Sequence, residues 1–284
     1  MTWIADAYFA ACLIELDALK PGNVHRHAPG HGMAAVDFEI SARVSAPAVA
    51  RTGARVGARV LDAVTATRAA VGQNTNLGIV LLCAPLAAAA ERGEPLNAGV
   101  RHVLGALDRD DARAVFEAIA TANPGGLGAV ERHDVRAAPV ASLREAMSAA
   151  AGRDLVARQF SNDFTEVLDF GQRAHAAACA AGASPADAAT AVYLEFLVAF
   201  PDSHIARKFG PKTAEAVRLE AAARLRALAG LRDPSTRLAE LLSWDADLKA
   251  RGLNPGTCAD LTVATVFAAR LASGDEWLAA PAQQ

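Results

Sequence analysis

The sequence predicts an all-α protein, built as a single large helical-bundle domain over residues 1–284. Alanine dominates the 284 residues, and alanine has the highest intrinsic helix propensity. Aromatic residues make up only 5%, and no segment shows the strict apolar-polar alternation of a half-buried strand. Apolar residues instead recur at three- and four-residue spacing between short breaks, as they do in amphipathic helices.

The first predicted helix covers about Thr2 to Leu19 and is apolar on more than one face. A helix of that kind is typical of the interior of a large bundle. Glu15 lies in the same stripe as Tyr8 and Cys12, so its carboxylate is directed into the packed interior. A carboxylate there must be paired, be hydrogen-bonded or line a cavity, and Glu15 is therefore a candidate site residue.

Four further helices follow along the chain. One carries Val56, Val60 and Val64, and the next is the apolar run over residues 77–90. Ser184-Pro185, typical of an N-cap and a first-turn proline, precedes the stripe of Ala189, Val192, Tyr193, Phe196, Leu197 and Phe200. Asp233-Pro234-Ser235 precedes the stripe of Leu238, Leu241, Leu242 and Leu248. Helices therefore recur at short intervals.

Breaks rich in Gly, Pro, Asn or Asp separate the predicted helices. They cover residues 20–31, 72–74, 122–139, 200–204 and 253–256. None resembles a flexible linker between domains, which favours one domain. The stretch 122–139 is the best candidate for a hinge or lid, because long irregular connections in compact domains are often functional or mobile.

Composition and charge exclude several classes of protein. With 52% hydrophobic and 21% charged residues, the chain can bury enough apolar surface to fold, so it is not a disordered protein. The formal net charge of -3 provides no bulk field for nucleic acid or an anionic membrane surface. The apolar run 77–90 contains Pro85 and is shorter than the roughly 18 residues that span a bilayer.

The cysteines and the N-terminus indicate the compartment. Four cysteines are scattered without a CxxC pair, so we expect reduced, buried thiols rather than disulfides or a zinc site. The N-terminal stretch carries Asp6 and no basic region, which does not predict a secretory signal. We therefore expect a cytoplasmic protein.

Polar residues concentrate in four segments, of which the first runs from Lys20 to Glu39. Lys20 and Arg26 lie on either side of Gly22, an arrangement that could cradle a phosphate, because glycine lets the backbone approach an anion. A surface loop with solvated charges is the alternative interpretation. The segment also holds His25, His27 and His31, which either converge on a metal or act as separate hydrogen-bonding groups.

The second segment, Gln73 to Gly78, opens the apolar helix. Asn74 or Thr75 could act as an N-cap. Four amides and hydroxyls in succession exceed what a cap requires and suit a purine or a ribose, which needs neutral donors and acceptors. A helix N-terminus also presents free N–H groups to an anion.

The third and fourth segments precede helices near the C-terminal end of the bundle. In Phe200 to Gly210, Asp202 or Ser203 can cap a helix, while Arg207 and Lys208 either serve a ligand or form a solvated basic end. In the fourth segment, Asn254 to Asp260, the aspartate lines up with apolar residues Ala264, Phe267 and Leu271. Asp260 therefore faces the interior and, like Glu15, requires a partner.

Together these segments resemble the triphosphoribosyl-dephospho-CoA synthase family, over most of the chain and in the same order. Residues 20–26, 30–33 and 38–42 stand where the family has PKPGLVDR, GAHxDM and FxxSA. Residues 74–78 stand at the family's NTHKG, and residues 201–210 resemble its acidic-Thr segment with a basic-Gly pair. Residues 253–261 resemble LSPGGSADLLAxT. As a set these motifs are specific.

The resemblance implies an all-helical enzyme that uses ATP and Mg²⁺ in cofactor biosynthesis. Such an enzyme displaces adenine from the ribose of ATP and attaches the triphosphoribosyl group to a ribose hydroxyl of dephospho-CoA. The product is the precursor of the prosthetic group of citrate lyase and malonate decarboxylase. Its partners are small nucleotide substrates, not nucleic acid or membrane. A homodimer is an option that the residues leave open.

The chain departs from the family pattern at two motifs. Asn76 and Leu77 replace His and Lys of NTHKG, which removes a cation, and His25 replaces the Asp of PKPGLVDR. Two alternatives follow. The chain is a related phosphoribosyl or nucleotide-processing enzyme, as in one-carbon carrier cofactor biosynthesis, or it is a non-catalytic nucleotide-binding protein.

These patterns and the resemblance assign candidate roles by residue. Proton transfer and catalysis are assigned to Glu15, His25 and Asp260. Magnesium is assigned to Asp37, Glu39, Asp202 and Asp260. Nucleotide binding is assigned to Lys20, Gly22, Asn23, Arg26, His31, Asn74, Thr75, Asn76, Ser203, His204, Arg207, Lys208 and Gly256.

Overall fold

The computed structural model describes residues 2–122, 139–231 and 233–274, and helices make up all of its named elements in those ranges. In chain order they are α1 (Trp3–Asp17), α2 (Ala35–Val49), α3 (Val56–Val71), α4 (Leu77–Ala90), α5 (Leu96–Ala106), α6 (Arg109–Ala122), α7 (Leu143–Ala150), α8 (Leu155–Ser161), the π-helix η1 (Glu166–Gly171), α9 (Gln172–Ala180), α10 (Pro185–Ala199), α11 (Ser203–Phe209), α12 (Pro211–Ala229), α13 (Pro234–Ala250) and α14 (Gly256–Ala272). The all-α prediction is confirmed.

Helix starts follow the capping chemistry read from the sequence. The Ser184 hydroxyl accepts a hydrogen bond from the Asp187 amide at 3.2 Å, with Pro185 in the first turn of α10. Asp233 caps α13 in the same way, through the Thr236 amide at 2.9 Å. Side chains thus satisfy amides that the helices leave unpaired at their N-termini.

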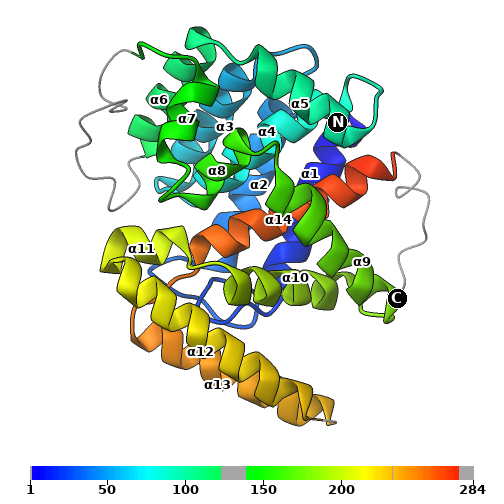
Figure 1. The fold of residues 1–284 in the computed structure, drawn as a ribbon, viewed down its shortest axis with the longest axis vertical. Coiled ribbons are helices and arrows are strands. Elements are labelled where there is room, and N and C mark those ends of the chain that lie inside the picture. The colour runs from blue at the N-terminus through cyan, green and yellow to red at the C-terminus, as the bar shows by residue number, and fades with distance from the viewer. Residues whose placement is uncertain (1, 123–138, 232, 275–284) are drawn as a thin grey trace.

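Helices α4 and α14 lie at the centre of the fold (Figure 1). Helix α14 packs against α1, α4 and α10, and α4 packs also against α3 and α5. Both are buried around most of their circumference, which explains why the run 77–90 is apolar without a polar face. Helix α4 continues through Pro85. No helix among the described residues is long and apolar enough to cross a membrane.

Helices α12 and α13 form the lower part of the molecule in Figure 1, beside α11. The predicted leucine stripe of α13 is correct only in part. Leu241 and Leu248 are buried, whereas Leu238 and Leu242, on the neighbouring side of the helix, are 47% and 36% exposed. A helix at the edge of the molecule buries one narrow face, and the sequence spacing alone had placed all four on it.

The predicted breaks coincide with connections between helices in the described ranges. The proposed hinge or lid over residues 122–139 lies almost entirely outside the described residues. Three cysteines are buried as expected, but Cys179, near the end of α9, is exposed, which corrects the prediction for that thiol. No group of three or more His, Cys, Asp or Glu side chains in the described residues could hold a metal ion.

Candidate functional site

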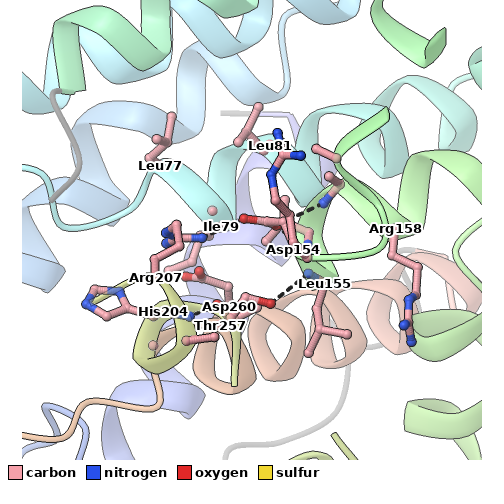
Figure 2. A pocket seen from close by; sticks show the side chains of 18 of the residues that line it. Leu77, Ile79, Leu81, Asp154, Leu155, Arg158, His204, Arg207, Thr257 and Asp260 are labelled. Carbon is pink, nitrogen blue, oxygen red and sulfur yellow. Dashed lines mark hydrogen bonds and ion pairs between the residues drawn. The ribbon is translucent and has the colours of Figure 1, made fainter. Parts of the chain in front are cut away.

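A cavity of about 1830 Å³ lies where the first turns of α4, α8, α11 and α14 face one another. It is lined by nine predicted site residues, namely Glu15, Asn23, Asn74, Thr75, Ser203, His204, Arg207, Gly256 and Asp260. Figure 2 shows Asp260 with Arg207 and Asp154 nearby, and Leu77 and Leu81 on the α4 side. Residues from all four polar segments therefore meet at one site.

Asp260 projects from α14 into this cavity. Within the described residues its carboxylate makes no hydrogen bond or ion pair. Burial raises its pKa well above the ordinary value, and the nearby negative charges of Glu15 and Asp202 raise it further. An inward carboxylate without a protein partner is a group held ready for a ligand.

Gly78 gives the Asp260 carboxylate its space in the first turn of α4. A Cβ atom on Gly78 would lie 2.1 Å from Oδ2 of Asp260. The glycine therefore permits a close approach between α4 and α14 that a side chain would block.

Glu15 and Lys20 form a buried ion pair, of which Glu15 lines the cavity and Lys20 does not. The Lys20 ammonium also donates to Oδ1 of Asn23 at 3.1 Å and to the carbonyl of Val24 at 2.7 Å. Asn23 in turn donates to Oδ1 of Asn254 at 2.7 Å, just before α14. Burial lowers the pKa of Lys20 and raises that of Glu15, and the attraction between the two charges offsets both shifts. Glu15 thus gains the partner that its position required.

Residues 20–31 form what we call the clasp, of which residues 20–25 are buried. The Gly22 amide donates to Oδ1 of Asp245 on α13 at 2.9 Å, and its φ of +85° suits glycine. A Cβ there would lie 2.9 Å from Cδ of Pro255. His31 Nε2 is 2.8 Å from the Gly22 carbonyl. Gly22 and His31 serve packing here and do not line the cavity.

His25 is buried beside Asp245, with Nε2 and Oδ1 3.3 Å apart. The geometry does not make a hydrogen bond, and burial lowers the pKa of the imidazole although Asp245 works against this shift. The ring does not line the cavity, so it does not reach a ligand bound there. The rings of His25 and His27 lie 5.5 Å apart between centroids, whereas His31 contacts the Gly22 carbonyl.

Asp37 and Glu39, the predicted metal ligands of the first segment, form contacts outside the cavity. Asp37 Oδ2 accepts from the Ala34 amide at 2.7 Å at the start of α2. Glu39 pairs with Arg26 at 3.2 Å, and Arg26 also pairs with Asp17 at 2.5 Å. Arg26, Asp37 and Glu39 do not line the cavity.

Asp202 joins two helix starts. Its Oδ1 accepts from the amides of His204 and Ile205, at 2.8 and 3.0 Å, and caps α11. Its Oδ2 accepts from the amide of Cys258 in α14 at 2.9 Å. With three backbone donors and 1% exposure, the carboxylate is engaged in holding α11 against α14. The four predicted metal ligands therefore do not form one cluster.

The second polar segment combines capping with cavity lining. Asn74 Oδ1 accepts from the Leu77 amide at 3.2 Å, as a cap of α4 does. Thr75 bonds to Ser41 at 2.6 Å between hydroxyl oxygens, and Asn76 donates to Oγ of Ser45 at 3.3 Å. Asn74 and Thr75 line the cavity, whereas Asn76 is turned toward α2.

A family model described as CitG, ATP:dephospho-CoA triphosphoribosyl transferase, matches residues 1–278. The chain belongs to this family. A solved structure from Archaeoglobus fulgidus, described as a putative triphosphoribosyl-dephospho-CoA synthase, is similar with a TM-score of 0.65 and 25% identity, over 84% of this chain and 98% of that one. No curated protein matches the chain in sequence. Membership makes the protein a transferase that uses ATP and releases adenine.

The cavity also contains charged groups that the sequence analysis did not assign to the site. Arg153, Asp154 and Arg158 line it from the start of α8. Asp154 Oδ2 pairs with Arg207 at 2.5 Å, while its Oδ1 caps α8 through the amide of Val156 at 2.9 Å. The pattern Gly152-Arg153-Asp154 before an apolar stretch was the available signal, since it combines a turn with a capping residue.

Proposed function

We propose that this cavity holds ATP and dephospho-CoA together and transfers the triphosphoribosyl group from the first to a ribose hydroxyl of the second. The supporting observation is the size of the cavity combined with the unpartnered Asp260. Pockets for one small ligand measure about 300–1,000 Å³. A cavity of about 1830 Å³ has room for two nucleotide-sized molecules.

In the proposed reaction the acceptor hydroxyl oxygen bonds to C1′ of the ATP ribose as the C1′–N9 bond to adenine breaks. The electron pair of that bond leaves with adenine, and the hydroxyl proton passes to a carboxylate and finally to the released base. Glu15 suits this role because it lines the cavity, and the buried ammonium of Lys20 favours its ionised form. His25 is too deeply placed behind the wall to take the proton.

Asp260 suits the binding of Mg²⁺. The ion usually takes one or two protein carboxylates together with substrate phosphates, so a single free carboxylate fits without a three-residue cluster. When bound, Mg²⁺ would neutralise part of the phosphate charge. Asp260 would hold the ion from the α14 side of the cavity. Gly78, in the first turn of α4, faces Asp260 and leaves room for its carboxylate.

The test is adenine release, followed by chromatography, from ATP with Mg²⁺ and dephospho-CoA. A matched control replaces the acceptor by periodate-treated dephospho-CoA, which lacks an intact ribose diol. Sustained release with the intact acceptor only, together with a product larger by one triphosphoribosyl group, supports the proposal. Equal release with both acceptors contradicts it.

A second candidate acceptor class is favoured by one observation. Leu77 lines the cavity at the place where the motif NTHKG has a lysine, so the α4 side contributes no cation. A related phosphoribosyl transfer to another nucleotide-type acceptor, as in one-carbon carrier cofactor biosynthesis, therefore belongs in the same assay. Release that depends on such an acceptor, and not on dephospho-CoA, selects this alternative.

A further inference from the structure

Three of the four cations that the sequence analysis assigned to nucleotide binding, all except Arg207, are engaged elsewhere. The three N–H donors of Lys20 all have acceptors, and the side chain is 1% exposed. Arg26 pairs with Asp17 and Glu39, and the Lys208 ammonium lies 5.2 Å from the centre of the Phe209 ring. None of the three lines the cavity. A triphosphate in the cavity needs other partners.

Arginines supply the cavity with positive charge. Arg158 pairs with Glu166 at 3.5 Å and is drawn apart from Asp260 in Figure 2. Arg207 pairs with Asp154. Arg153 precedes Asp154 directly and makes no ion pair within the described residues, so its guanidinium is available. Arg153 and Arg207 therefore line the same cavity, Arg153 just before α8 and Arg207 on α11.

We propose that Arg153 and Arg207 bind the triphosphate chain of ATP, and that Asp154 is the resident counter-anion which the phosphate replaces at Arg207. The assignment rests on the proposed function for its ligand. A guanidinium presents several donors in one plane and binds a phosphate or a carboxylate through the same edge, so the two anions compete for Arg207.

Asp154 is built to stay in place during that exchange. One of its oxygens accepts from the amides of Val156 and Ala157, at 2.9 and 3.1 Å, and only the other meets Arg207. When Arg207 turns to phosphate, the cap of α8 remains intact. The exchange therefore requires no refolding of the cavity wall, and the guanidinium is held near its ligand position beforehand.

The test uses calorimetric titration of the full chain with inorganic tripolyphosphate, with EDTA present so that arginine binding is measured without metal. Arg153→Gln and Arg207→Gln should each weaken binding by about tenfold or more, because a charge-assisted contact is lost. Arg113→Gln is the matched control, since Arg113 on α6 does not line the cavity and pairs with Asp110 at 2.9 Å. It should bind as the wild type does.

Asp154→Asn supplies a result that misfolding cannot imitate. Asparagine keeps the oxygen that caps α8 but removes the negative charge that competes for Arg207. Tripolyphosphate should therefore bind several-fold more tightly. Weaker or unchanged binding by this variant overturns the role of Asp154.

Two further outcomes are separable. Wild-type protein that binds both ATP and tripolyphosphate, with both glutamine variants binding equally well, overturns the arginine assignment and leaves the proposed function standing. Wild-type protein that binds neither ligand, with or without Mg²⁺, overturns the proposed function and this inference together.

Discussion

Two polar regions of the molecule look alike in sequence and differ in what they do. The clasp formed by residues 20–31 has cations, histidines and glycines, and so does the rim formed by residues 152–154 and 203–208. In the clasp, Lys20 and Gly22 are bound to Glu15 and Asp245 inside the protein. In the rim, Arg153 and Arg207 face the cavity.

The difference shows that residue type alone does not make a ligand site. A buried charged group needs partners, and once its donors are satisfied within the protein it has none left for a substrate. In our proposal the clasp contributes stability and shape, while the rim and Asp260 bind the ligand. Variants in the two regions should accordingly affect different measurements.

The largest effect is expected at Asp260. Asp260→Asn should abolish Mg²⁺-dependent ATP binding and reduce kcat/KM by about 10³, a magnitude typical of losing one electrostatic contact to developing charge. Stability should be unchanged or higher, because the variant removes an inward carboxylate that has no partner. Calorimetric titration beside a thermal melt measures both. A destabilised variant that binds Mg²⁺ and ATP normally would contradict the proposed role of Asp260 in metal binding.

In the clasp, Lys20→Met should mainly reduce stability, by about 3–5 kcal/mol, because it leaves the buried Glu15 charge unpaired. Glu15→Gln combined with Lys20→Met should recover part of that loss. Arg26→Gln, in the same segment but exposed, should change stability by at most about 1 kcal/mol. Chemical denaturation gives these values. A stable Lys20→Met protein with a raised KM for ATP would instead support the phosphate-binding role that the sequence analysis gave to Lys20.

A pH dependence of stability should arise from the rim. Burial, with the charges of Arg207 and Lys208, lowers the pKa of His204 to about 4 from 6.5. As pH falls from 6.5 to 4 the unfolded state binds the proton first, so the free energy of unfolding decreases, by at most about 3 kcal/mol from this group.

His204→Asn should flatten the pH profile of unfolding between pH 6.5 and 4. His25 in the clasp has a pKa lowered by burial, so part of the slope should persist in His204→Asn. An identical pH dependence of the free energy of unfolding in the wild type and in His204→Asn would contradict the expected contribution of His204.

The smallest effect is expected at Gly78. Gly78→Ala should displace the Asp260 carboxylate and lower kcat/KM by about tenfold, the equivalent of about 1.4 kcal/mol. Gly105→Ala is the control, because a Cβ there meets open space on helix α5. That variant should keep full activity and gain up to about 1 kcal/mol of stability from helix propensity. Equal activity of the two variants would show that Asp260 tolerates displacement.

The sequence was sufficient for features that depend on local periodicity. The direction of Asp260 followed from its stripe with Ala264 and Phe267, which are both buried, and the start of α10 followed from Ser184-Pro185. The need of Glu15 for a partner followed from burial alone. Motif order was sufficient to identify the family.

Roles that depend on distant parts of the chain were not predictable in this way. Asp202 was assigned to metal, but its second oxygen meets the amide of Cys258, 56 residues later. Arg153 and Asp154 lie in a short turn without periodicity, so the local pattern indicates a turn and a capping residue but not that the two side chains face the cavity. Whether a polar group is engaged or available is settled by tertiary packing, which a motif does not record.

The clasp also sets the order in which the molecule can be completed during synthesis. Gly22 bonds to a residue 223 positions later, and Asn23 to one 231 positions later. Until α13 and α14 leave the ribosome, the Gly22 amide and the Asn23 side chain lack these partners, and the apolar surface of α4 lacks its cover by α14. Contacts of such long range make folding slow and expose aggregation-prone intermediates. Chains that stall before residue 254 should therefore depend on chaperones, since the cavity forms only when the N-terminal and C-terminal helices meet.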